Sequence, residues 1–129
     1  MAVLIPVSWG ELFDKITILQ IKAERITDPA QNINIRKELA QLQKVLNKTG
    51  PLSPELFNLM EALRQVNIQL WEIEDDIRNC ERRKCFNEQF IFLARSVYYS
   101  NDKRSEIKNN INILLGSEII EEKSYESYS

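Results

Sequence analysis

Hydrophobic positions recur with one spacing over a long stretch of the chain, from Pro54 to Lys84. The apolar residues of this stretch follow steps of three and four: Leu56, Leu59, Leu63, Val66, Leu70, Ile73, Ile77 and Cys80. Such steps place side chains on one face of an α-helix, and a continuous apolar face packs against other helices. The pattern predicts a helix that spans roughly 45 Å, at about 1.5 Å per residue.

A second line with the same spacing follows between Asn87 and Gly116. Its members are Phe90, Leu93, Val97, Ser100, Arg104, Ile107, Ile111 and Leu114. Ser100 and Arg104 interrupt its apolar character, and polar residues in a coiled-coil seam cost stability while they fix register. Asn87 suits an N-cap and Gly116 suits a helix end. We therefore expect the two long helices to form an antiparallel hairpin.

Two shorter helices are predicted before the hairpin. Ser8 and Glu11 have the spacing of a capping box, so the first helix is expected to run from there to about residue 26. Asp28 and Pro29 suit the start of a second helix, which ends before Gly50. The apolar face of the first helix is Leu12, Ile16, Leu19, Ala23 and Ile26, widened by Ile18 and Ile21, and that of the second is Ile35, Leu39, Leu42 and Leu46.

Together these elements predict a single all-α domain over residues 1–129. We expect an antiparallel four-helix bundle built on the long hairpin, with the first two helices packed along it. Short extended arms are expected at both ends, over about residues 1–7 and 117–129. Residues 2–5 suit a short strand, and residues 117–122 suit a strand or helical turn that packs Ile119 and Ile120. Residues 124–129 are expected to form a mobile tail.

Composition narrows the classes of function. The chain has 17 basic and 19 acidic residues, a balance that argues against nucleic-acid binding. It has no histidine, which excludes Ser/His/Asp and Cys/His nucleophile systems and His-ligated metals. No apolar run approaches the roughly 20 residues of a membrane helix, and the start of the chain lacks the features of a signal peptide. A cytoplasmic protein without membrane contact is expected, with Cys80 and Cys85 as free thiols.

Three blocks of the sequence carry a resemblance: PVSWGELFDKITILQIKAERI, VNIQLWEIEDDIR and LARSVYYSNDKRSEIKNNINILLGSEIIEEKSY. Together they resemble an uncharacterised family of small bacterial helical proteins, classed as a domain of unknown function. The resemblance extends from Pro6 to Tyr125 and implies no enzyme activity. The resemblance also implies that genes of this family lie at times near genes for glycosyltransferases and surface sugars. This implies an accessory role in surface-sugar biosynthesis.

Polar side chains form a second stripe beside the apolar lines. The candidate residues of a ligand groove are Lys15, Arg64, Asn67, Trp71, Glu74, Arg78, Tyr98, Asn101, Arg104 and Lys108. If their faces meet, the groove suits an anionic small molecule, because the arginine fork matches phosphate and carboxylate. The alternative is structural: Glu74 and Arg78 form an ion pair one turn apart, the asparagines set register, and Trp71 belongs to the core.

Two further sites are conceivable from the sequence. The acidic cluster Glu72, Glu74, Asp75 and Asp76 has the spacing for magnesium, although a solvated acidic face explains it better. The first helix also resembles the opening helix of small helical mutases, in which Lys15, Arg25 and Arg78 would hold a dicarboxylate. We expect neither a metal nor a cofactor.

The leading hypothesis is a non-enzymatic helical protein that works by association, as a homodimer. A long hairpin in a small chain leaves apolar side chains off the main lines, namely Ile21, Phe92, Tyr99 and Ile113. The second hypothesis is a protein or enzyme that binds a small anionic ligand in the polar groove.

Overall fold

The computed structural model describes residues 2–128, and within this range the chain forms four α-helices and no strand. Their bounds are Trp9–Arg25 (α1), Pro29–Asn47 (α2), Pro54–Arg82 (α3) and Glu88–Leu115 (α4). The predicted all-α fold and the order of its helices are confirmed.

Each helix begins at the predicted N-cap. The caps are Ser8, Asp28, Ser53 and Asn87, and the side-chain oxygen of each accepts a hydrogen bond from the backbone N–H three residues later. Gly116 ends α4 in the left-handed conformation, with φ of 62°. Helix α3 stops two residues before the predicted end, because Lys84 adopts the left-handed conformation with φ of 55°. These caps satisfy backbone groups that a helix end otherwise leaves without partners.

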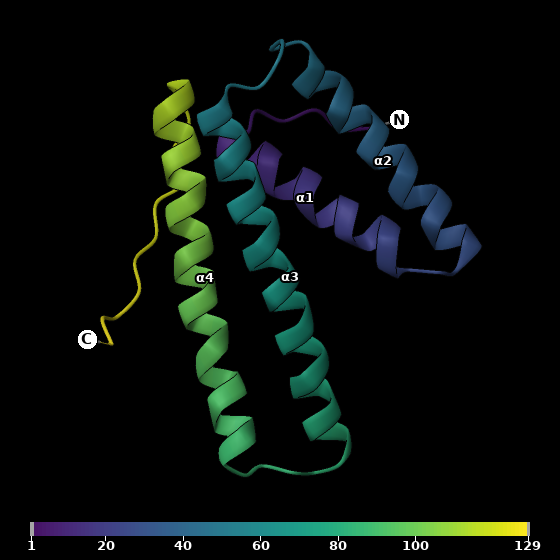
Figure 1. Ribbon diagram of the computed structural model, residues 1–129, viewed down its shortest axis with the longest axis vertical. Coiled ribbons are helices and arrows are strands. Elements are labelled where there is room, and N and C mark those ends of the chain that lie inside the picture. Colours follow the sequence, from purple (N-terminus) through teal and green to yellow (C-terminus); the bar gives the residue numbers. More distant parts are fainter. Residues whose placement is uncertain (1, 129) are drawn as a thin grey trace.

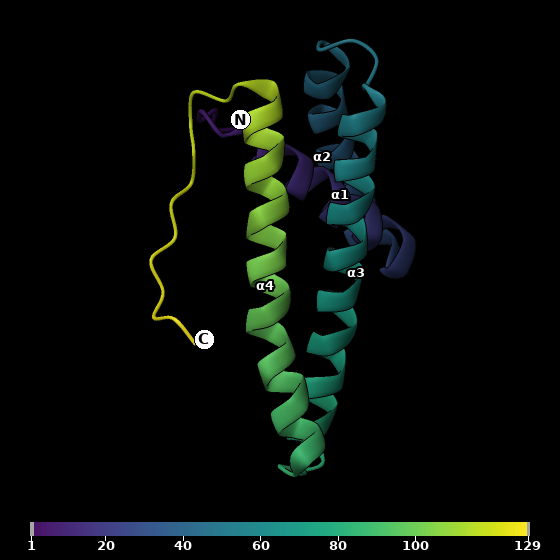
Figure 2. The ribbon, with the colours of Figure 1, turned by 60° about the vertical axis from the view of Figure 1, so that its left-hand side comes forward.

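The long helices α3 and α4 run antiparallel, and α1 crosses the hairpin near the end that holds the start of α3 (Figure 1). Helix α1 packs against all three other helices, as its wide apolar face predicts. The prediction that α2 also packs along the hairpin is wrong, since α2 packs against α1 (Figures 1 and 2). Only Leu46 of α2 is buried, so its narrow apolar face serves one neighbouring helix.

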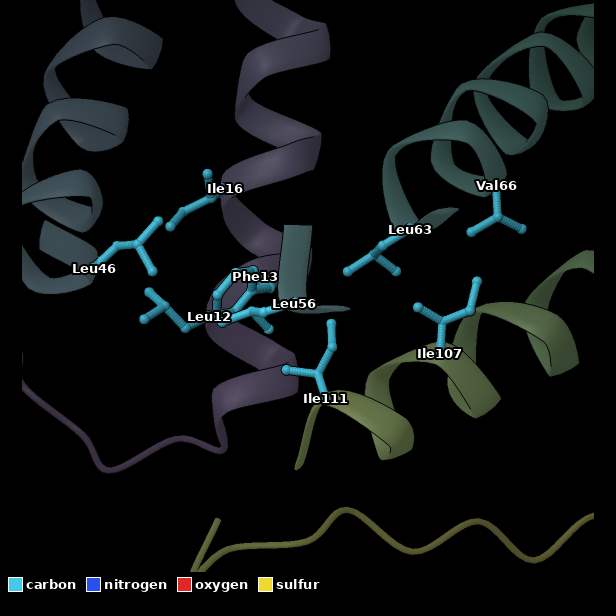
Figure 3. Packing of buried hydrophobic residues seen from close by; sticks show 9 residues of the cluster. All are labelled: Leu12, Phe13, Ile16, Leu46, Leu56, Leu63, Val66, Ile107 and Ile111. Atoms are coloured by element: carbon cyan, nitrogen blue, oxygen red, sulfur yellow. The ribbon is translucent and has the colours of Figure 1, made fainter. Parts of the chain in front are cut away.

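The hydrophobic core lies where α1 crosses the hairpin (Figure 3). Its buried members are Leu12, Phe13, Ile16, Leu46, Leu56, Leu63, Val66, Ile107 and Ile111. Burial of one such side chain contributes roughly 1.5–3 kcal/mol, so this cluster supplies much of the free energy that holds α1 on the hairpin.

The remainder of the hairpin, about residues 73–100, lies beyond the ion pair of Arg25 with Glu72, has no other helix over it and is called the open half below (Figures 1 and 2). Here the two predicted lines still face each other, with Cys80 and Leu93 buried. Several other members are only half-buried: Ile73, Ile77, Phe90 and Val97. No member of either line is fully exposed, which agrees with the predicted hairpin.

Both arms lie outside the helices, as predicted, but the strands or helical turn suggested within them do not form. Residues 2–7 form no strand and are exposed, and residues 117–122 form neither a strand nor a helical turn. Ile119 is 41% exposed and Ile120 is 50% exposed, so neither is buried by packing as expected. Residues 117–128, called the C-terminal segment below, run beside α4 (Figure 2). The predictions for Met1 and Ser129 concern positions outside the described residues.

Several smaller predictions can also be compared with the structure. Ile21 is 1% exposed, so the expectation that it remains available for a partner is wrong. Phe92, Tyr99 and Ile113 are exposed, as expected. Cys80 and Cys85 are free thiols. Among the helices described, none combines the length and the hydropathy that crossing a membrane requires.

Candidate functional site

A carboxylate lies in the interior where α1 crosses the hairpin. Asp14 of α1 is 1% exposed, and its Oδ1 accepts hydrogen bonds from Arg104 Nε and Asn67 Nδ2, both at 2.9 Å. Arg104 Nη2 contacts the other oxygen, Oδ2. Asn67 also donates to Thr17 Oγ1 at 3.0 Å. A desolvated carboxylate is tolerated only when it is paired and hydrogen-bonded, so these contacts tie α1 to both long helices.

Lys108 of α4 extends this cluster, which we call the Asp14 network: Asp14, Thr17, Asn67, Arg104 and Lys108. The Nζ atom of Lys108 lies 2.9 Å from Glu11 Oε2, 3.1 Å from Glu121 Oε2 and 3.8 Å from Asp14 Oδ2. Burial alone lowers the pKa of Lys108, but its carboxylate neighbours raise the pKa above the ordinary value. The hydrogen bond with Asp14 raises the pKa of Arg104 in the same way. Both side chains therefore stay cationic at physiological pH.

The start of α1 approaches α4 closely at Gly10. The Gly10 backbone N–H donates to Asn112 Oδ1 at 2.7 Å. A Cβ atom at Gly10 would lie 2.5 Å from the backbone oxygen of Lys108, a distance that real Cβ atoms do not tolerate. The absent side chain of Gly10 thus permits the helix crossing that brings Glu11 and Asp14 to Lys108.

A hollow of about 280 Å³ opens beside the Asp14 network, between α4 and the C-terminal segment. It is lined by Glu11, Asn101, Asp102, Arg104, Ser105, Lys108, Glu121, Lys123 and Tyr125. Glu121 lies between two ammonium groups, since its Oε1 is 2.9 Å from Lys123 Nζ and its Oε2 contacts Lys108. These hydrogen bonds, that of Lys123 first, lower the pKa of Glu121.

The far end of the C-terminal segment is attached to α4 by an aromatic contact. The Tyr128 hydroxyl donates to Asp102 Oδ2, and this bond raises the pKa of Tyr128 to about 12. The Tyr128 ring lies 5.2 Å from the ring of Tyr98 and 4.8 Å from that of Tyr99, measured between centroids. Glu121 and Tyr128 are thus two separate points at which the segment contacts α4.

The structure brings some of the predicted groove residues together and separates others. Asn67, Arg104 and Lys108 meet around Asp14, and Asn101 lines the adjoining hollow. The others lie elsewhere. Lys15 is exposed and Trp71 is half-buried. Arg64 pairs with Glu24 at 2.6 Å, Glu74 pairs with Arg78 at 3.6 Å, and the ring of Tyr98 contacts that of Tyr128. Whether any of the ten residues binds a ligand stays a prediction.

Asp14 and Thr17 were missed by the sequence interpretation, although the sequence holds a signal for them. They lie three residues apart within the apolar face of α1, between Phe13 and Ile18, where two polar residues are unusual. The interruption of the α4 line by Arg104 is the matching signal, because a cation in a packing seam requires an acidic partner.

The geometry gives little support to the magnesium site and to the mutase-like dicarboxylate site. Glu72, Glu74, Asp75 and Asp76 are all exposed, and within residues 2–128 no three side chains of metal-ligating type are grouped for an ion. Of the residues for the mutase hypothesis, Arg25 pairs with Glu72 at 3.4 Å and Arg78 pairs with Glu74. Both oxygens of Asp14 already accept hydrogen bonds, so this carboxylate is poorly suited to act as a base.

No curated protein and no solved structure matches the chain. A family model covers nearly the whole chain, including the four helices and most of both arms. That model matches residues 3–128, and the chain belongs to the family it describes, the family of unknown function DUF6165.

Proposed function

We propose that this protein works by association, as a homodimer in which a second copy packs on the open half of the α3–α4 hairpin. In such a dimer the two open halves form one four-helix unit, and each copy's α1 and α2 remain at opposite ends. The proposal assigns no catalysis to the chain. The resemblance implies neighbouring genes for glycosyltransferases and surface sugars, and such neighbours suit an accessory or scaffold protein of this kind.

One contrast along the hairpin supports the proposal. Where α1 covers the hairpin, Leu63, Val66, Ile107 and Ile111 are between 0% and 7% exposed. In the open half, Cys80 and Leu93 are buried, but other members of the same two lines are only half-buried, among them Ile73, Ile77 and Phe90. Two helices alone cannot surround a shared apolar line, and a helix pair gains most of its stability from further packing. A second copy would supply the packing that α1 supplies at the other end.

The surface beside the open half has the composition of an association surface. The stripe of α3 that includes Asn67, which contacts α1, continues at helical spacing through Trp71, Glu74 and Arg78. Tryptophan and arginine are enriched at the centres of protein interfaces. In an antiparallel, two-fold symmetric dimer whose axis passes midway between these two residues, Glu74 of one copy would face Arg78 of the other.

Substitution of one small exposed residue tests the proposal. Ala94 is exposed on α4 in the open half, so Ala94→Glu leaves the monomer intact but places a carboxylate in the proposed interface. Ala40→Glu, at an exposed position of α2, is the matched control. Light scattering coupled to size exclusion is expected to show a dimer for the wild type and Ala40→Glu and a monomer for Ala94→Glu. Equal masses for all three chains would contradict the proposal.

A further inference from the structure

We infer that the hollow between α4 and the C-terminal segment binds a small hydroxylated oxyanion, a carboxylate or a phosphate ester. In the unliganded chain the carboxylate of Glu121 takes the position of that anion. The hollow adjoins the open half at Asn101 and Asp102. The ligand is not required for the proposed dimer, and ligand binding and chain mass are measured separately, so the two proposals are tested by different readouts.

Two cations supply donors that the fold leaves available. The Arg104 guanidinium uses Nε and Nη2 on Asp14, and its Nη1 has no hydrogen-bond partner within residues 2–128. Lys108 has three N–H donors, and Glu11 and Asp14 of α1 lie close to its Nζ. Its third carboxylate neighbour, Glu121, is 44% exposed and belongs to the C-terminal segment, so this donor becomes available when Glu121 moves away. Arg104 and Lys108 are one turn apart on α4 and both line the hollow, so they can contact one oxyanion together.

Two neutral polar side chains line the same hollow. The Asn101 amide and the Ser105 hydroxyl make no hydrogen bond with any other described residue. Asn101, Ser105 and Lys108 follow one another at helical spacing, so their side chains share a face. Amide and hydroxyl groups next to a pair of cations suit a ligand that carries hydroxyl groups beside its charged group.

Glu121 shows that the hollow accommodates an anion. Its carboxylate contacts Lys108 and Lys123 at once, at 3.1 Å and 2.9 Å. The segment around it has no regular secondary structure, and exposed ion pairs of this kind stabilise weakly. A free oxyanion can therefore displace Glu121, and the side chain then acts as an internal competitor that lowers the apparent affinity.

The competition can be tested through ligand affinity. If Glu121 competes with the ligand, its replacement strengthens ligand binding, whereas a purely structural role predicts no such gain. Glycerate and glycerol phosphate serve as the carboxylate and phosphate probes, and binding is followed by the NMR amide shifts of Ser105, Lys108 and the C-terminal segment. Glu121→Gln is expected to lower the Kd of the better probe about two- to five-fold, because an exposed ion pair no longer competes. Glu122→Gln changes the net charge equally, and its Kd is expected to equal that of the wild type.

Removal of the hydrogen-bond donors of the hollow is the second part of the binding test. Lys108→Met is expected to weaken binding at least about tenfold, and Ser105→Ala, which leaves the Asp14 network in place, about three-fold. Ser105→Ala keeps the test decisive if Lys108→Met disturbs α1. The probe that binds more tightly identifies the charged group of the ligand. Equal Kd values for Glu121→Gln and Glu122→Gln, or no shift with either probe at tens of millimolar, would overturn the inference.

Discussion

Asp14 of α1 and Arg104 of α4 form a two-point ion pair in the interior although they lie 90 positions apart in the sequence. The Nε–Oδ1 distance is 2.9 Å, and Nη2 contacts Oδ2. The planar guanidinium fixes both the distance and the orientation of the carboxylate, so this pair sets how α1 lies across the hairpin. Asn67 adds the third helix through its bond to the same oxygen as Arg104 Nε.

Removal of the acid from this pair is expected to destabilise the fold strongly. Asp14→Ala leaves Arg104 half-buried without its counter-charge and Asn67 without its acceptor, so the free energy of unfolding is expected to fall by about 3–5 kcal/mol. Asp76→Ala, at an exposed position of α3, is the control and is expected to change it by less than about 0.5 kcal/mol. Urea unfolding measures both. A loss below about 1 kcal/mol for Asp14→Ala would show that the pair does not hold α1 in place.

A methyl group at Gly10 is expected to force α1 away from α4. Since the new Cβ would lie 2.5 Å from the Lys108 backbone oxygen, Gly10→Ala should destabilise the chain by about 1–3 kcal/mol. This outcome is opposite to the gain that Gly→Ala gives in an unobstructed helix. Thermal unfolding distinguishes the two, and a raised Tm would mean that the crossing is looser than described.

The turn between α3 and α4 is expected to be improved by glycine. Lys84 has φ of 55°, a conformation that costs an L-residue roughly 1 kcal/mol and costs glycine nothing. Its ion pair with Glu81 is long, at 4.0 Å, and exposed, so little is lost with the side chain. Lys84→Gly should raise the free energy of unfolding by about 0.5–1 kcal/mol, whereas Lys103→Gly within α4 should lower it by a similar amount.

Acidification is expected to release the C-terminal segment before the helices unfold. The pKa of Glu121 is lowered in the folded chain, so its ion pairs contribute stability above the ordinary value of 4.5 and lose it as the pH falls through the lowered value. Amide relaxation of residues 118–127 should therefore show faster motion once the pH falls through that lowered pKa, while the helices stay intact. Glu121→Gln should show that motion already at neutral pH. Release that tracks helix unfolding in both chains would contradict this account.

The helices follow from local features of the sequence, and the site does not. Caps such as Ser53 and Asn87 act within one turn, so their positions and the apolar spacing suffice to place the helices. The position of α2 depends on how much apolar area each neighbour offers, and the partner of Arg104 depends on the crossing of α1. The position of α2 and the partner of Arg104 both depend on residues far apart in the sequence. Asp14 was therefore missed, although Arg104 visibly interrupts the apolar line of α4. The C-terminal segment has no periodicity at all, and only the structure places Glu121 at Lys108.

The open half of the hairpin is the feature on which the proposed function depends. Its half-buried residues predict that the chain is paired in solution, because a second copy would bury them. Sedimentation equilibrium over a range of concentrations measures this most directly. The account predicts a mass of twice the chain's 15.1 kDa, with dissociation only on dilution. A mass of 15.1 kDa that persists at the highest concentration would contradict it.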